Sequence, residues 1–170
     1  MRTLLLLRHG KSDWKQQTSE DFDRPLNERG RDAADHVGQW MKQHHLPPEW
    51  VICSPAARTR ETLMLLRAHL PVPDTLIDFD DRVYLADVGT LLAVLAHCPQ
   101  DMNNILVIGH NPGLEQLLEY LCGENLPLSA KGKLMPTATL AQIALPDDWR
   151  GLAARSGKMI HIVRPDELTS

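Results

Sequence analysis

The chain has 170 residues, which suits one globular domain, and we expect residues 1–170 to fold as a single unit. With 43% hydrophobic residues, 24% charged residues, 10 Gly and 12 Pro, the composition excludes disordered and fibrous proteins. The net charge of −4 gives no general attraction to nucleic acid or to an anionic membrane, so neither is an expected partner.

The charge is divided unevenly along the chain. Residues 1–60 carry 10 Lys and Arg against 8 Asp and Glu, whereas residues 61–170 carry 8 against 14. We therefore expect any basic site to lie early in the chain.

Neither export nor metal binding is indicated. The apolar run at residues 3–7 is shorter than a signal peptide or a membrane span, so a cytoplasmic location is expected. Cys53, Cys98 and Cys122 show no CxxC spacing and are expected to be free thiols. Apart from the adjacent His44 and His45, no histidines or cysteines stand at the close spacing of zinc ligands, and we expect no metal and no cofactor.

Apolar runs alternate with helical patterns, which predicts an α/β fold. Residues 4–7, 51–53 and 105–108 are continuous apolar runs, typical of parallel strands that are buried on both faces. Residues 75–79 are expected to add a strand. Residues 137–145 and 159–164 are expected to form an antiparallel pair at the sheet edge, and residues 124–137 an irregular loop.

Four helices are predicted between these strands from apolar spacing and capping residues. The first helix is capped by Asn27 and ends before residue 47, and the second has Ser54 and Pro55 as its cap and first turn. The third helix is capped by Asp87, and the fourth begins at Pro112 and is ended by Gly123.

Three predicted strands are followed directly by polar segments that suit phosphate binding. These are Arg-His-Gly-Lys-Ser at 8–12, Ser-Pro-Ala-Ala-Arg at 54–58 and Gly-His-Asn-Pro-Gly at 109–113. Ligand sites of open α/β sheets lie at the carboxyl ends of strands. If the three strands are neighbours, two arginines and two histidines converge at helix N-termini, where an anion is favoured.

A phosphoryl group is the natural ligand of such a site. Arg8 and Arg58 supply planar donors for phosphate oxygens, and one histidine can complete the cradle. The second histidine, when neutral, can attack phosphorus through a ring nitrogen. Gly10 would allow the backbone to approach the phosphoryl oxygens. Each segment could also be an ordinary turn or helix cap. The occurrence of all three at equivalent strand ends favours the interpretation as one phosphate-binding site.

These segments resemble the signature motifs of the histidine phosphatase superfamily, which is phosphoglycerate mutase-like, and specifically its small SixA-type phosphohistidine phosphatases. The resemblance rests on Leu-Arg-His-Gly at 7–10, on Ser54-Pro55 with Arg58 and Thr59, and on Gly-His-Asn-Pro-Gly at 109–113. It implies a three-layer α/β/α sandwich with a mostly parallel sheet. It also implies that His9 is the phosphorylated nucleophile, and that Arg8, Arg58 and His110 hold the phosphoryl group.

Other residues near the motifs have less defined roles. Lys11 and Ser12 are candidate phosphate contacts, or they only shape the first loop. Residues 21–26 are similar to a segment common in SixA-type members, and we interpret them as a loop leading into the first helix. Trp14 either lines the site entrance or packs at the surface.

The proton donor is the weakest match to the family. Mutase-like members have a glutamate before an Arg-x-Tyr stretch, and here Asp81 precedes Arg-Val-Tyr with a shorter carboxylate. Asp80 competes with Asp81 for this role, and both residues have the alternative of capping a turn. Many SixA-type sequences have Glu after the Tyr, where this chain has Leu85.

A weak acid suits phosphohistidine as the substrate. Phosphoimidazole protonated on its other nitrogen leaves as neutral imidazole, whereas a serine alkoxide needs a proton from the enzyme. The predicted function is therefore hydrolysis of phosphohistidine on a protein, such as a histidine-containing phosphotransfer domain, through phospho-His9. The alternatives are a phosphatase of small phosphomonoesters and a non-catalytic phosphoprotein-binding module. A monomer is the expected state.

Overall fold

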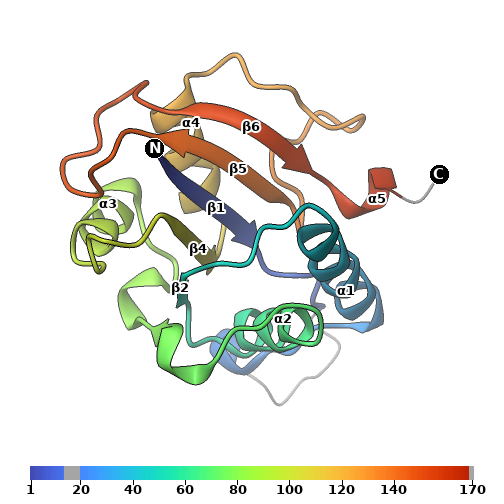
Figure 1. Cartoon of the computed structure of the whole chain (residues 1–170). Coiled ribbons are helices and arrows are strands. Elements are labelled where there is room, and N and C mark those ends of the chain that lie inside the picture. Colours follow the sequence, from blue (N-terminus) through green and yellow to red (C-terminus); the bar gives the residue numbers. More distant parts are fainter. Residues whose placement is uncertain (14–19, 169–170) are drawn as a thin grey trace.

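The structure is a computed structural model that describes residues 1–13 and 20–168, and within them the strands form one six-stranded sheet (Figure 1). The strand order is β3-β2-β4-β1-β5-β6. The first four strands run parallel, and β5 and β6 form an antiparallel pair at one edge, as predicted. Their bounds are β1 (Arg2–Arg8), β2 (Trp50–Cys53), β3 (Ile77–Phe79), β4 (Asn104–Gly109), β5 (Leu140–Leu145) and β6 (Lys158–Val163).

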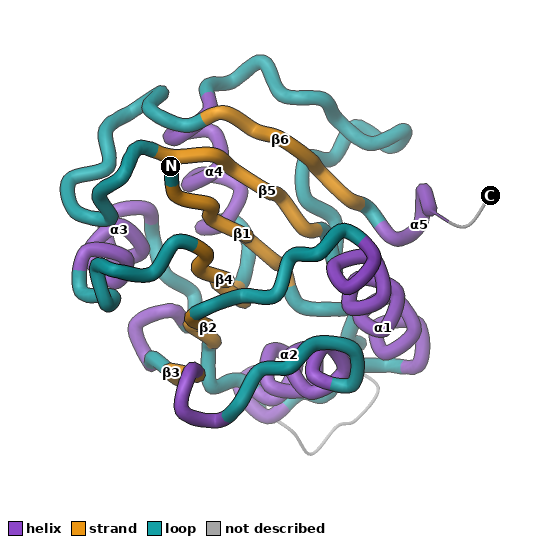
Figure 2. The backbone as a smooth tube through the Cα atoms, in the orientation of Figure 1, coloured by secondary structure: helices purple, strands orange, loops and turns teal. Residues whose placement is uncertain are grey.

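Helices cover both faces of the sheet and complete the predicted α/β/α sandwich (Figure 2). On one face lie α1 (Glu28–Gln43) and α2 (Ala57–Arg67), and on the other lie α3 (Val88–Ala96) and α4 (Gly113–Cys122). The short helix α5 (Pro165–Leu168) follows β6, and three 3-10 turns are η1 (Asp21–Asp23), η2 (Asp74–Leu76) and η3 (Asp81–Val83). No helix in the described ranges has the length and apolar character to cross a membrane.

The apolar run of β1 is explained by this layering. Leu4 and Leu6 pack in the core beneath α3 and α4, whereas Leu5 and Leu7 pack in the core beneath α1 and α2. None of the four is more than 1% exposed. Because neighbouring side chains of a strand point to opposite faces, a central strand covered on both faces has no polar position.

Among the predicted helix ends, the caps Asn27 and Asp87 and the stop at Gly123 are confirmed, and the cap Ser54 is wrong. Asn27 accepts a hydrogen bond from the Gly30 amide at 2.8 Å, and Asp87 accepts one from the Thr90 amide at 2.8 Å. Helix α2 begins only at Ala57, so Ser54 lies too far from it to be its cap. The Ser54 hydroxyl instead faces a histidine, as described below.

Two strands begin later than predicted, each for a local reason. Strand β5 starts at Leu140 because Ala138 has a left-handed backbone with φ of 59°, and its amide donates to the His9 carbonyl at 2.9 Å. Strand β3 starts at Ile77 because the residues before it form η2. Trp14 lies outside the described residues.

Candidate active site

The three polar segments meet at one edge of the sheet. Strand β4 lies between β1 and β2, so the carboxyl ends of these parallel strands are adjacent. The side chains of His9, Arg58 and His110 are 6%, 3% and 5% exposed, although all three are polar. Buried polar groups of this kind need partners, and these residues find them largely in one another.

His9 presents one ring nitrogen to the site and uses the other to fix its orientation. Its Nδ1 lies 2.7 Å from the Gly10 carbonyl oxygen, which can only accept, so Nδ1 carries the proton. Its Nε2 is then an acceptor, and the Arg58 Nε donates to it at 3.3 Å. Burial, assisted by the nearby cations, lowers the pKa of His9 to about 3. The imidazole is therefore neutral at physiological pH and carries a lone pair on Nε2.

His110 is held by a second pair of hydrogen bonds. Its Nδ1 lies 3.2 Å from an Arg58 guanidinium nitrogen, and its Nε2 lies 2.8 Å from the Ser54 hydroxyl oxygen. Because a guanidinium can only donate, Nδ1 is the acceptor and Nε2 carries the proton. Burial, followed by the charge of Arg58, lowers the pKa of His110 to about 3. The rings of His9 and His110 lie 5.2 Å apart between centroids.

Arg58 joins the two histidines to a segment without a predicted chemical role. One guanidinium nitrogen donates to the Asp21 carbonyl at 2.7 Å, and the other donates to the Asp21 carboxylate at 3.1 Å. The Tyr84 hydroxyl donates to that carboxylate at 2.5 Å, and the Tyr84 ring stands edge-on to His110. The hydrogen bonds from Tyr84, Arg24 and Arg58 hold the pKa of Asp21 well below its usual range against the effect of burial, so this carboxylate is ionised.

Sequence reasoning therefore missed Asp21 as a residue of the site. The sequence marks residues 21–26 only as a loop, and nothing in it indicates that its first carboxylate contacts an arginine 37 positions away. Tyr84 was recognised only as part of a motif around the proton donor.

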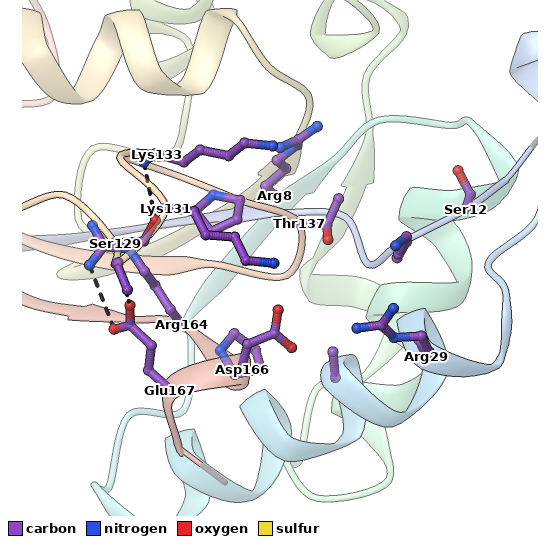
Figure 3. Close-up of a pocket in the computed structure, with 15 residues that line it drawn as sticks. Arg8, Ser12, Arg29, Ser129, Lys131, Lys133, Thr137, Arg164, Asp166 and Glu167 are labelled. Atoms are coloured by element: carbon purple, nitrogen blue, oxygen red, sulfur yellow. Dashed lines mark hydrogen bonds and ion pairs between the residues drawn. The ribbon is translucent and has the colours of Figure 1, made fainter. Parts of the chain in front are cut away.

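Arg8, Lys11 and Ser12 all line a neighbouring groove, and Figure 3 shows Arg8 and Ser12 at separate places along it. The Arg8 guanidinium donates to the Met135 carbonyl at 3.0 Å, and burial lowers its pKa. Ser12 accepts a hydrogen bond from Arg24, and Lys11 is exposed. Arg8 adjoins His9 in the chain, whereas Lys11 and Ser12 form no hydrogen bond with His9, Arg58 or His110 within the described residues.

Gly10 is required by the packing of the first loop, and its predicted role in the approach of a phosphoryl group stays a prediction. A Cβ atom at Gly10 would lie 2.6 Å from the Gly30 carbonyl oxygen of α1, a distance that no side chain tolerates. The Gly10 amide donates to the Thr62 hydroxyl at 3.1 Å. The glycine therefore lets the first loop lie against the start of α1, which sets the direction of His9.

The two candidate proton donors differ in their surroundings. Asp80 accepts from the Arg82 amide at 2.9 Å and pairs with its guanidinium at 2.8 Å, which holds the pKa of Asp80 below its usual range. Asp81 is the exposed first residue of η3, and its side chain has no hydrogen bond or ion pair with another described residue. Asp81 is thus the less constrained of the two, and its role as proton donor stays a prediction.

The cysteines are free, as expected. Burial raises the pKa of Cys53 and Cys98 to about 12 and that of Cys122 to about 11. Within residues 1–13 and 20–168, no group of three His, Cys, Asp or Glu side chains is placed to hold a metal ion. The site presents two neutral imidazoles and the buried guanidinium of Arg58.

Comparison with known proteins agrees with this chemistry. Residues 4–84 match the family model of the histidine phosphatase superfamily (branch 1). An uncharacterised chloroplastic protein of Arabidopsis thaliana is 30% identical to this chain, and the match covers 97% of this chain and 78% of the plant protein. The phosphohistidine phosphatase SixA of Escherichia coli is 28% identical over 87% of this chain and 88% of its own.

A solved structure shares the whole fold. The crystal structure of a putative phosphohistidine phosphatase SixA from Agrobacterium tumefaciens superimposes with a TM-score of 0.82. It is 29% identical in sequence, and the match covers 96% of this chain and 98% of that one. The similarity therefore extends well beyond the segment matched by the family model.

Proposed function

The chain belongs to the histidine phosphatase superfamily, and from that premise we propose that it hydrolyses phosphohistidine on a protein through a phosphorylated His9. The observation that carries this proposal is the tautomer of His9. Its Nδ1 donates to a fixed backbone carbonyl, which leaves Nε2 with a lone pair beside Arg58. A residue that only bound phosphate would need no nucleophilic nitrogen at this position.

The proposed reaction has two steps. In the first step, His9 Nε2 forms a bond to phosphorus while the phosphorus–nitrogen bond of the substrate breaks, and the departing imidazole takes that electron pair. In the second step, water attacks phosphorus, the bond to Nε2 breaks with its electron pair returning to Nε2, and both protons of the water leave on the phosphate. Neutral His9 is restored, and the hydrogen bond from its Nδ1 to Gly10 holds the ring in place throughout.

The surrounding groups stabilise the negative charge on the oxygens of the transferred phosphoryl group. Arg58 and Arg8 are the proposed partners of the phosphoryl oxygens, because guanidinium groups make paired hydrogen bonds to such oxygens. His110 is expected to donate to the same group from Nδ1, which requires the other tautomer of the ring, in which the Ser54 hydroxyl donates to Nε2. Ser54, the present partner of His110 Nε2, sets the orientation of that ring.

The preference for a phosphorus–nitrogen bond follows because the site has only a weak candidate for a general acid. The imidazole leaving group is stable when neutral, with a conjugate acid of pKa about 6.5, and so needs less help than an alkoxide. Similarity to the SixA phosphatases of Escherichia coli and Agrobacterium tumefaciens supports the same substrate class.

The test is trapping of the intermediate. The protein is mixed with a phosphotransfer domain carrying radiolabelled phosphohistidine, quenched with alkali after milliseconds, and digested to locate the label. We expect a labelled peptide containing His9, complete loss of turnover in His9→Ala, and normal turnover in the control His36→Ala, whose side chain is exposed on α1. A tungstate soak would then show which side chains surround the oxyanion, and whether Asp81 does so.

Three results would contradict the proposal. Hydrolysis by purified His9→Ala protein would exclude His9 as the nucleophile. Binding of the phosphoprotein without a labelled adduct or phosphate release would indicate a binding module. Faster turnover of a panel of sugar phosphates than of phosphohistidine protein would indicate a phosphatase of small phosphomonoesters.

A further inference from the structure

A groove of about 740 Å³ is lined by Arg8 but not by His9, Arg58 or His110 (Figure 3). One wall is the first loop and the start of α1, including Lys11 and Arg29. The facing wall is the loop before β5, including Lys131 and Lys133. In Figure 3, Lys131 and Lys133 extend from one side, and Arg29 faces them from the other.

The groove concentrates positive charge in a protein that is acidic overall. Lys11, Arg29, Lys131 and Lys133 are all exposed, and none of them forms an ion pair with a carboxylate of the described residues. The whole chain has a net charge of −4. The expectation that a basic site lies early in the chain was therefore incomplete, because two of these four cations come from residues 131–133.

The turn that carries the two lysines is braced. The Ser129 amide donates to the Lys133 carbonyl at 2.8 Å, and the Lys133 amide donates to the Ser129 hydroxyl at 3.1 Å. Gly132 takes the left-handed conformation, with φ of 76°, that this tight turn requires. Below the turn, the buried Arg164 guanidinium donates to the Leu134 carbonyl at 2.9 Å and to a second carbonyl of the same loop. The lysines thus project from a fixed backbone.

Arg8 connects the groove to the site. Its guanidinium donates to the carbonyl of Met135, close to the turn, and its Nε is buried without a hydrogen-bond partner among the described residues. Arg8 also adjoins His9. The Arg8 charge also acts on both His9 and His110, so a molecule bound along the groove at Arg8 would lie next to the site.

The arrangement of the charges favours an acidic protein surface over a second phosphate group. The four cations come from three separate segments and are solvent-exposed, whereas a small anion needs donors that converge on one point. Dispersed exposed cations instead meet several carboxylates and accelerate association with an acidic partner. Asp166 and Glu167 also line the groove, and Glu167 is paired with Arg164. Asp166 would repel an acidic partner, which limits the direction from which that partner approaches.

We infer that this groove docks an acidic surface of the phosphohistidine protein, with the carboxylates that flank the phosphohistidine facing Lys131, Lys133, Lys11 and Arg29. The inference rests on the proposed function for the identity of the substrate. The groove determines which phosphohistidine protein is preferred, while the site determines the reaction.

The test compares two synthetic phosphohistidine peptides of equal length, one with Asp and Glu and one with Asn and Gln around the phosphohistidine. The variant is Lys131→Gln with Lys133→Gln. The control is Lys42→Gln, an exposed lysine in the last turn of α1 and about 20 Å along the helix from Arg29. The measured quantity is kcat/KM for dephosphorylation at low and high salt.

We expect the unaltered protein to prefer the acidic peptide about tenfold at low salt, and this preference to shrink at high salt because the charges are exposed. The double variant should lose most of the preference through a higher KM, with unchanged kcat/KM for the neutral peptide. Lys42→Gln should behave as the unaltered protein. An equal response of both peptides to the double substitution, or no preference for the acidic one, overturns the inference.

A binding measurement separates this inference from the proposed function. If neither peptide is hydrolysed, the proposed function fails, and the groove is tested by fluorescence anisotropy with a labelled acidic peptide that carries no phosphate. Salt-sensitive binding that weakens at least fivefold in the double variant but not in Lys42→Gln upholds the groove. Equal binding by all three proteins overturns it.

Discussion

Acid should destabilise this protein through the two buried histidines of the site. The pKa values of His9 and His110 are lowered to about 3 in the folded chain, from an ordinary value of 6.5. Between these values the unfolded chain binds a proton at each residue and the folded chain does not. The unfolded state therefore binds more protons, so stability is lost as the pH falls below 6.5 and is fully present above it.

The size of the effect follows from the two pKa values. A pH of 5 is about 1.5 units below the pKa of a histidine in the unfolded chain, so that histidine is protonated. The same histidine in the folded chain is still neutral. Each pKa unit corresponds to about 1.4 kcal/mol, so each of the two histidines should cost about 2 kcal/mol at pH 5 relative to pH 7.5. Both side chains are at least 94% buried, and solvent therefore screens them little.

The assay is urea unfolding at pH 7.5 and pH 5.0 of the unaltered protein and of His9→Asn and His110→Gln. An Asn amide can replace the His9 Nδ1 donor to Gly10, and a Gln amide can replace the His110 Nε2 donor to Ser54, so each variant removes the titration and keeps one hydrogen bond. Buffers must lack phosphate and sulfate, because a bound anion stabilises the folded state.

The unaltered protein should lose about 2 kcal/mol more than either variant between the two pH values. The rest of the chain is the same in all three proteins and cancels in the comparison. The same loss in all three proteins would show that the site histidines do not stay neutral at pH 5, and the argument for a neutral His9 nucleophile would fail with it.

Three further results are expected. Arg58→Ala should lower kcat/KM for a phosphohistidine protein by about 10²–10³, the usual effect of losing one electrostatic clamp, and a loss below tenfold would remove Arg58 from the reaction. Asp21→Asn should tighten inhibition by inorganic phosphate about fivefold, because it removes a partly exposed negative charge 3.1 Å from the Arg58 guanidinium; weaker inhibition would indicate that Asp21 chiefly positions Arg58. Cys53, whose pKa is raised to about 12 by burial, should resist iodoacetamide at pH 8 until the protein is unfolded, as mass spectrometry of the alkylated peptide can show.

The sheet could be predicted because its strands are encoded locally. A four-leucine run has no amphipathic face, so it fits only a strand covered by helices on both sides, and β1 has this environment. The motifs at 8–12, 54–58 and 109–113 could be placed at one edge because parallel strands end on the same side. The caps at Asn27 and Asp87 are also local, since each side chain bonds the amide three residues ahead.

Features that depend on tertiary contacts could not be predicted in the same way. Ser54 has the sequence of a helix cap, but the start of α2 two residues beyond Pro55 leaves its hydroxyl to His110. Asp21 has no periodic or spacing signal, and its role depends on how the η1 turn packs against Arg58. The basic groove combines residues from the early and the late part of the chain. Counting charges separately in each part of the sequence cannot show that these residues meet.

The protonation of Asp21, Asp80 and Asp81 determines which kind of phosphoryl bond the site is suited to break. Asp21 is ionised and engaged by Arg58 and Tyr84, and Asp80 is ionised and engaged by Arg82, so neither can deliver a proton to a leaving group near neutral pH. Only Asp81 is uncommitted among the predicted acids. A phosphate ester, whose alkoxide must be protonated as it departs, would depend on Asp81 alone, whereas a phosphohistidine departs as a neutral imidazole. Substitution of Asp81 by Asn should therefore slow ester hydrolysis far more than phosphohistidine hydrolysis, and equal slowing of both would contradict the proposed preference.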